Sequence, residues 1–116
     1  MATTLFILNE APYGSERVYN GLRLAGALTA IEGQQVQVFL LADAVFSAKA
    51  GQKVPEGFYN VQLMLAKVAR KGEVVLCGTC MDARGLTDAE LMEGAARGTL
   101  TQLAAWTATA DKVLVF

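Results

Sequence analysis

The chain of 116 residues contains no histidine, and this absence excludes several kinds of active site. A Ser–His–Asp triad, a histidine proton shuttle, an HExxH zinc site and a two-histidine iron site all need an imidazole. Zinc bound by thiols alone needs four of them, and the chain has only two, so such a site would require two subunits. We therefore predict no metal site and no cofactor.

Charged residues are also scarce and nearly balanced. They make up 18% of the chain, and ten Lys and Arg against eleven Asp and Glu give a net charge of −1. Because no basic stripe is present, nucleic-acid binding has no electrostatic support. No apolar run is long enough to cross a membrane, and none follows a basic segment as in a signal peptide. We expect a cytoplasmic protein with no membrane or nucleic-acid partner, whose two cysteines stay reduced.

Hydrophobic residues, in contrast, are abundant. They make up 53% of the chain, which is enough for one folded domain over residues 1–116. A domain of this size leaves about one third of the surface of its unfolded chain exposed. The surplus of apolar residues therefore predicts burial in a subunit interface, and hence a homo-oligomer.

The hydrophobic pattern predicts alternating strands and helices. Four runs have the apolar character of strands covered on both faces, at residues 3–8, 35–41, 73–77 and 112–116. Apolar residues at helical spacing predict helices at residues 18–31, 44–50, 58–71, 88–97 and 99–109. Ser15 is the expected N-cap of the first helix, and Thr87 with Glu90 forms a capping-box pattern for the fourth.

This order of elements predicts an α/β fold, with three α/β/α layers around a mainly parallel sheet of four or five strands. In such a sheet, all loops that follow a strand leave from the same edge, where ligands bind. The loops at residues 9–15, 42–43 and 77–85 should therefore meet at one rim. Both cysteines belong to the last of these loops.

The segment Cys77-Gly-Thr-Cys80 carries the most distinctive chemistry of the chain. A thiol between a strand and a helix, with Arg84 nearby, is favoured as the thiolate, which is the form that attacks disulfides and sulfane sulfur. Cys77 alone also fits an inert buried cysteine, because free cysteine is among the most buried residue types.

Three neighbours of the cysteines are candidates for the same site. Gly78 and Gly85 would let the backbone approach a bound group closely. Asp82 would either order the loop or orient Arg84.

Further candidate binding residues lie in the three loops: Glu10, Tyr13, Gly14, Ser15, Asp43 and Thr79. Residues 9–15 match neither a Walker loop nor GxGxxG, so no nucleotide-binding motif is present, and an ordinary strand-to-helix turn explains them as well. Asp43 suits a helix cap. Glu10 is a candidate general base beside the thiols.

Taken together, five segments of the chain resemble the DsrE/DsrF-like (YchN-like) family of small sulfur-relay proteins. In order, they read NEAPYGSER (9–17), DAVFSAKAGQ (43–52), GFYNVQLML (57–65), CGTCMDARG (77–85) and ADKVLVF (110–116). The resemblance implies a three-layer α/β/α fold and a homotrimer or homohexamer. It also implies that some relatives carry sulfur as a cysteine persulfide between donor and acceptor proteins.

The resemblance also indicates which cysteine would accept sulfur. In relay members the acceptor lies eight residues before the glycine of an Arg-Gly pair, and Arg84-Gly85 places that position at Cys77. Cys80 has no counterpart in those members. The loop that contains both cysteines is similar to that of a family branch with CxxC loops followed by DARG. Such a loop allows an internal Cys77–Cys80 disulfide.

Three functions follow as hypotheses. The first is a sulfur carrier with sulfurtransferase-like chemistry, in which Cys77 holds a persulfide, Arg84 and loop amides stabilise the anion, and Cys80 resolves the persulfide. The second is a dithiol redox protein or sensor that uses the CxxC pair. The third is a non-enzymatic oligomeric module that binds a small ligand between subunits, with structural cysteines.

Overall fold

The computed structural model describes residues 1–116 and contains five strands in one sheet. The strands are β1 (Ala2–Leu8), β2 (Gln34–Leu40), β3 (Glu73–Cys77), β4 (Ala95–Gly98) and β5 (Lys112–Val115). All pairings are parallel, and the strand order is β4-β3-β2-β1-β5. The predicted parallel sheet is therefore confirmed, with β2 at its centre and β1 between β2 and the edge strand β5.

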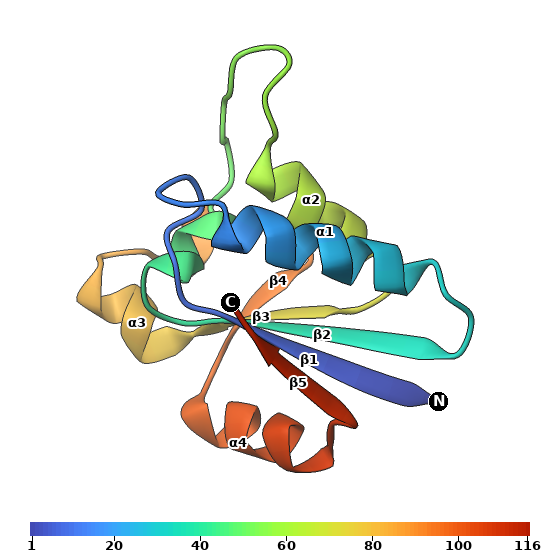
Figure 1. Ribbon diagram of the computed structural model, residues 1–116. Helices are drawn as coiled ribbons and strands as arrows, with labels where there is room; N and C mark the ends of the chain where they lie inside the picture. The colour runs from blue at the N-terminus through green and yellow to red at the C-terminus, as the bar shows by residue number, and fades with distance from the viewer.

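Four α-helices and two short 3-10 helices connect the strands. The α-helices are α1 (Arg17–Thr29), α2 (Val61–Ala69), α3 (Gly78–Ala83) and α4 (Leu100–Thr109). The 3-10 helices are η1 (Ala42–Ala48) and η2 (Asp88–Glu90). Figure 1 shows α1 and α2 on one face of the sheet and α4 on the other, so the three-layer α/β/α architecture is confirmed.

Two hydrophobic clusters fill the space between these layers, because successive residues of a strand point to opposite faces. Phe6, Val38 and Leu76 belong to the cluster under α1 and α2. Phe39 and Cys77 belong to the smaller cluster on the face of α4. β1, β2 and β3 thus contribute alternate side chains to the two sides, as their apolar sequences predict.

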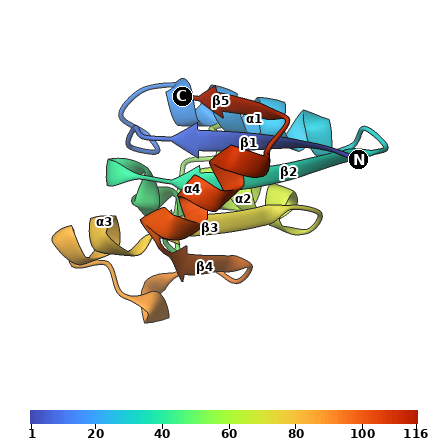
Figure 2. The ribbon, with the colours of Figure 1, turned by 90° about the horizontal axis from the view of Figure 1, so that it is seen from below.

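The face of the sheet that carries the smaller cluster is only partly covered by helices. One ten-residue helix, α4, lies on that side, between strands at opposite edges of the sheet (Figures 1 and 2). At the β5 edge, Val113 and Val115 are 38% and 64% exposed. Leu100 at the start of α4 is also exposed.

The prediction of a helix over residues 88–97 was wrong. The capping interaction forms, since the Glu90 carboxylate accepts hydrogen bonds from the backbone N–H and the hydroxyl of Thr87, each 3.0 Å long. The turn ends after η2, however, because Leu91 is extended and Gly94 has a φ of +92°. The chain then forms the edge strand β4, which pairs with β3.

Helix boundaries differ from the predictions in smaller ways. The helix predicted from residue 58 begins at Val61, with Asn60 as its N-cap, and Phe58 remains 69% exposed. Ser15 does not cap α1, since Glu16 occupies that position without a side-chain bond, although the Ser15 hydroxyl accepts from the Arg17 N–H at 3.3 Å. None of the helices is both long and apolar enough to cross a bilayer.

Candidate functional site

Cys77 occupies the junction between the sheet and the cysteine loop. It is the last residue of β3 and the N-cap of α3. Its Sγ accepts a hydrogen bond from the backbone N–H of Cys80 at 3.3 Å and lies 3.2 Å from Oγ1 of Thr79. The CxxC spacing thus places the second cysteine in the first turn of a helix that the first cysteine caps.

These contacts give the two thiols different acidities. Burial raises the pKa of Cys77, but hydrogen bonds from Cys80 and Thr79 lower it by more, so the pKa lies below its ordinary value. Burial and the hydrogen bond to Cys77 raise the pKa of Cys80 above its ordinary value. The pair therefore ionises first at Cys77, and the thiolate is the nucleophilic form of cysteine.

A pocket of about 270 Å³ opens beside Cys77. Cys77 itself is only 6% exposed, yet it lines this pocket. The other lining residues come from α3, β4 and the start of α4: Gly78, Thr79, Asp82, Arg97, Gly98, Thr99 and Leu100. Cys80 does not line the pocket. A small molecule in this pocket would therefore meet one of the two thiols.

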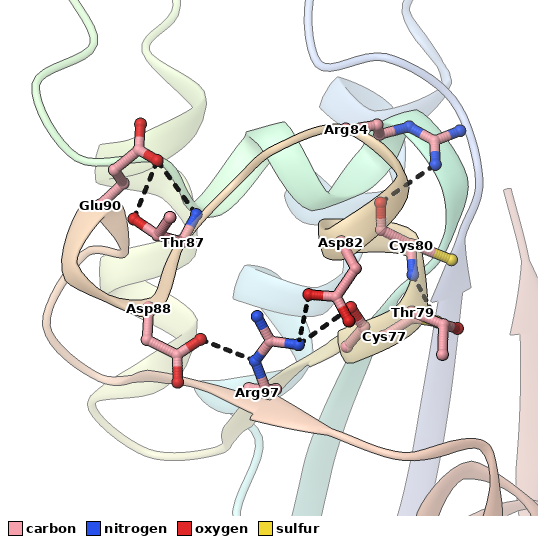
Figure 3. A network of polar contacts seen from close by, with 10 residues as sticks. Cys77, Thr79, Cys80, Asp82, Arg84, Thr87, Asp88, Glu90 and Arg97 are labelled. Atoms are coloured by element: carbon pink, nitrogen blue, oxygen red, sulfur yellow. Dashed lines mark hydrogen bonds and ion pairs between the residues drawn. The ribbon is translucent and has the colours of Figure 1, made fainter.

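Four residues of this pocket, Arg97, Gly98, Thr99 and Leu100, were not predicted from the sequence, and Arg97 makes the most contacts to the cysteine helix. Its Nη1 donates to the carbonyl oxygen of Gly78 at 3.0 Å and to Oδ1 of Asp82 at 3.1 Å, and its Nε donates to Oδ1 of Asp88 at 2.7 Å. Figure 3 shows its guanidinium between the two carboxylates, next to the cysteine helix. The hydrogen bonds to Asp88 and Asp82 raise the pKa of Arg97. A single arginine on the edge strand thus holds α3 and η2 together.

Asp82 consequently pairs with Arg97 and not with Arg84. Arg84 lies on the other side of α3, where its Nε donates to Oδ1 of Asp43 at 2.8 Å and its Nη1 donates to the Cys80 carbonyl at 3.1 Å. Its positive charge is one of the influences that lower the pKa of Cys80, whereas the groups that shift the pKa of Cys77 are Cys80 and Thr79. Asp43 is thus an ion-pair partner, and its side chain makes no helix-capping hydrogen bond.

Ala42, next to Asp43, has an unusual backbone conformation. It is the one residue other than glycine with a positive φ, +50°, and its backbone N–H lowers the pKa of Cys80. Left-handed backbone at a residue with a Cβ is strained and clusters at functional sites. The loop after β2 therefore reaches the loop after β3, as the parallel topology predicts.

The loop after β1 is only partly in the predicted place. Its side chains contact the start of α1, the start of α2 or the segment before α2, and none makes a hydrogen bond or ion pair with the cysteine loop. Glu10 lies 4.0 Å from Arg17, and the Tyr13 hydroxyl donates to Gln52 and accepts from the Val61 N–H. Gly14 packs close to Ala11.

The two candidate glycines have different roles. A Cβ on Gly78 would lie 3.0 Å from Nη1 of Arg97 and 3.1 Å from the Gly98 carbonyl, so a side chain here would push against Arg97 and β4. Gly85 has a φ of +66°, a conformation that favours glycine where the chain leaves α3. Both thiols are free, and no group of three or more acidic or cysteine side chains is arranged to hold a metal ion.

The fold and the site define a three-layer α/β/α protein with a dithiol at the carboxyl edge of its parallel sheet. The profile of the DsrE/DsrF-like family matches residues 3–116, and the chain belongs to this family. It is 47% identical to protein YchN of Escherichia coli K12 over 118 residues, with full coverage of both chains. It is also 40% identical to an uncharacterised protein of Methanopyrus kandleri over 111 residues, covering 95% of this chain and 90% of that protein.

Solved structures support the same assignment. The crystal structure of YchN from E. coli matches with a TM-score of 0.94 at 46% identity over all of both chains. A protein of unknown function from Methanobacterium thermoautotrophicum matches with a TM-score of 0.80 at 11% identity, again over all of both chains, which shows a shared fold.

Proposed function

We propose that this protein accepts a sulfane sulfur as a persulfide on Cys77 and passes it on. The observation that carries the proposal is that the thiol with the lowered pKa is also the one that lines a pocket. Membership of the DsrE/DsrF-like family, which is commonly linked to sulfur relay, supports it. A reducing, cytoplasmic environment is part of the proposal, because both thiols must start reduced.

The loading step is a thiol–persulfide exchange. The Cys77 thiolate attacks the terminal sulfur of a donor R–S–SH, a new Cys77–sulfur bond forms, and the donor S–S bond breaks. The donor leaves as the thiolate R–S⁻, so no net oxidation or reduction takes place. The N–H of Cys80 and the Thr79 hydroxyl, which lie within hydrogen-bond distance of Sγ, support the charged nucleophile before the attack.

Cys80 would act as the resolving thiol. Its sulfur attacks Sγ of Cys77, a Cys77–Cys80 disulfide forms, and the outer sulfur leaves as hydrosulfide. The dithiol is thereby oxidised by two electrons and the sulfane sulfur is reduced, so a thiol reductant must regenerate the protein. The raised pKa of Cys80 keeps it protonated at first, which gives the persulfide time to be transferred to a thiol acceptor.

Intact-protein mass spectrometry after exposure to inorganic polysulfide tests the proposal. We expect Cys80→Ala to gain the mass of one sulfur atom and keep it, because the resolving thiol is gone. Wild type should gain the same mass and then lose hydrogen sulfide as the disulfide closes, which leaves it two hydrogens lighter than the reduced protein. Cys77→Ser should gain nothing, and an equal gain on Cys77→Ser would overturn the proposal.

A dithiol redox function is the second candidate, favoured by the hydrogen bond between Cys80 and Cys77. It differs from the carrier in needing no sulfane sulfur. If mild oxidation closes the disulfide readily while polysulfide never adds sulfur to Cys80→Ala, the redox function is preferred.

Self-association into a trimer or hexamer, and transfer to donor and acceptor proteins, belong to the same proposal. The partly covered sheet face supports an oligomer, since Val115 and Leu100 are 64% and 70% exposed beside the single helix α4. Exposed apolar groups of this kind are buried when copies of a chain associate. The pocket beside Cys77 includes Leu100, so an interface on this face would border the site.

A further inference from the structure

We propose that the pocket beside Cys77 selects sulfur donors with an ammonium group, so that its substrates are hydropersulfides of small aminothiols and not oxyanions such as thiosulfate. The inference rests on the proposed function, because it concerns the donor that loads Cys77. Its basis is the pattern of charge in the pocket and the size of the pocket.

Asp82 supplies the group that would bind the ammonium. It lines the same pocket as Cys77 and lies on the same face of α3 as Thr79, three residues earlier. Its side chain is 68% exposed, and its Oδ1 accepts one hydrogen bond from Arg97. Its other carboxylate oxygen makes no hydrogen bond or ion pair within the chain, so the carboxylate retains acceptor capacity.

The positive charges near the pocket are already compensated. Arg97 is bound by two carboxylates, those of Asp82 and Asp88, so this group of three side chains has a net charge of −1. Arg84, on the other side of α3, is paired with Asp43. The reactive thiolate of Cys77 adds a further negative charge. A dianion such as thiosulfate therefore meets repulsion, whereas an ammonium group is attracted.

The dimensions of the pocket restrict the donor to small molecules. Its volume of about 270 Å³ falls below the usual range of about 300–1,000 Å³ for sites of drug-sized ligands. Cys77 is 6% exposed and lines this space. An aminothiol persulfide is slender, and its ammonium group is separated from the sulfur pair by a short carbon chain. It can therefore contact Asp82 while its terminal sulfur faces Cys77.

Binding an ammonium beside the reacting sulfurs also suits the exchange. The Cys77 thiolate attacks the terminal sulfur of the protonated persulfide, and the departing aminothiol leaves as a thiolate with its ammonium still present. The charge that develops on the leaving sulfur is then close to a positive group of the same molecule. Only the S–S bond is exchanged, and no oxidant or reductant is consumed.

The test compares four donors in the Cys80→Ala background, where the added sulfur stays on Cys77. The donors are the persulfides of cysteamine and cysteine, which carry an ammonium, the persulfide of 3-mercaptopropionate, which does not, and thiosulfate. Rates of sulfur addition are measured by intact mass under single-turnover conditions. We expect the two ammonium-bearing donors to react at least about tenfold faster than the other two, because a modest difference in electrostatic energy between donors changes the rate by this factor.

Two variants, Asp82→Asn and Asp82→Glu, test whether the negative charge of Asp82 causes the preference for donors with an ammonium group. The Asn variant should bring the four rates to within about threefold of one another and accelerate thiosulfate, while the Glu variant should keep a preference for ammonium. Glu32→Gln is the matched control, because it removes the same charge from an exposed position without an ion pair and should keep the wild-type order.

Similar rates for all four donors, or a thiosulfate rate equal to that of cysteamine persulfide, would overturn the inference and leave the carrier function standing. A uniform loss of rate with every donor in Asp82→Asn would also overturn it, since that result indicates a structural role. If no donor adds sulfur to Cys77, the proposed function itself fails.

Discussion

The backbone N–H of Cys80 donates a hydrogen bond to Sγ of Cys77 over 3.3 Å, and this contact sets the two thiols apart. Together with side-chain hydrogen bonds from Cys80 and Thr79, it stabilises negative charge on Cys77 and lowers the pKa of that thiol, against the effect of burial. Burial, the hydrogen bond to Cys77 and the charge of a Cys77 thiolate raise the pKa of Cys80. The two cysteines are therefore unequal in acidity.

Alkylation should distinguish the two thiols directly. At pH 7 we expect iodoacetamide to modify Cys77 faster than Cys80, because the lower pKa of Cys77 gives it the larger thiolate fraction. As the pH rises, the rate at Cys77 should level off first. Residue-resolved mass spectrometry over a pH series measures both rates, and faster modification of Cys80 would contradict the assignment.

The single-cysteine variants test the coupling between the thiols. In Cys80→Ala, the pKa of Cys77 should rise, because the side-chain hydrogen bond from Cys80 is lost while the backbone N–H remains. In Cys77→Ala, the pKa of Cys80 should fall, since both its hydrogen bond to the other thiol and the neighbouring negative charge disappear. The same alkylation series in each variant gives the two pKa values. Unchanged values would mean that the thiols titrate independently.

Replacement of Arg84 should affect Cys80 more than Cys77. Arg84→Gln removes a positive charge whose influence lowers the pKa of Cys80, so the pKa of Cys80 should rise further. The alkylation rate of Cys77 at pH 7 should change less than about twofold, a shift of a few tenths of a pKa unit. A large slowing at Cys77 would instead support the role that the sequence analysis gave to Arg84.

Loss of Arg97 should weaken the attachment of the cysteine helix. Arg97→Ala removes hydrogen bonds to the Gly78 carbonyl, Asp82 and Asp88, so we expect a lower melting temperature by differential scanning calorimetry. Arg17→Ala is the control, because its contact with Glu10 is 4.0 Å long and largely exposed and should contribute little. Equal effects of the two variants would contradict the role of Arg97.

The partly covered sheet face leads to a prediction about assembly. Light scattering should show an oligomer of three or six chains for the wild type, and Val115→Asp should shift it toward smaller species by placing a charge in the interface. Ile31→Asp, at a residue that is 54% exposed beyond the end of α1, should leave the assembly unchanged. A monomeric wild type, or an intact oligomer of Val115→Asp, would exclude this face as the interface.

The central part of the fold could be predicted from the sequence because its elements are defined locally. β1, β2 and β3 are short apolar runs, which indicate strands that are buried on both faces. β4 could not be predicted, because Ala95–Gly98 has the sequence AARG, without a β-branched or aromatic residue. It is a strand because its backbone pairs with β3, a long-range effect that local patterns do not contain.

Long-range pairing also explains why some residues of the candidate site could not be predicted from the sequence. The CxxC segment and its helix follow from spacing, and the approach of Asp43 to this loop follows from parallel topology. Arg97 lies nineteen residues after Gly78 and reaches it only because β4 pairs with β3. Tyr13 lies in a loop at the predicted rim, but its hydroxyl bonds to Gln52 and Val61, on a segment whose path the sequence did not indicate.

Peptide mapping of the folded protein after brief treatment with equimolar polysulfide tests the central claim most directly. The trapped persulfides are alkylated and each cysteine is assigned by tandem mass spectrometry. The account predicts that the added sulfur is found on Cys77 within the first turnover and that prior alkylation of Cys77 abolishes the addition. Sulfur found mainly on Cys80, or undiminished addition after Cys77 is blocked, would contradict it.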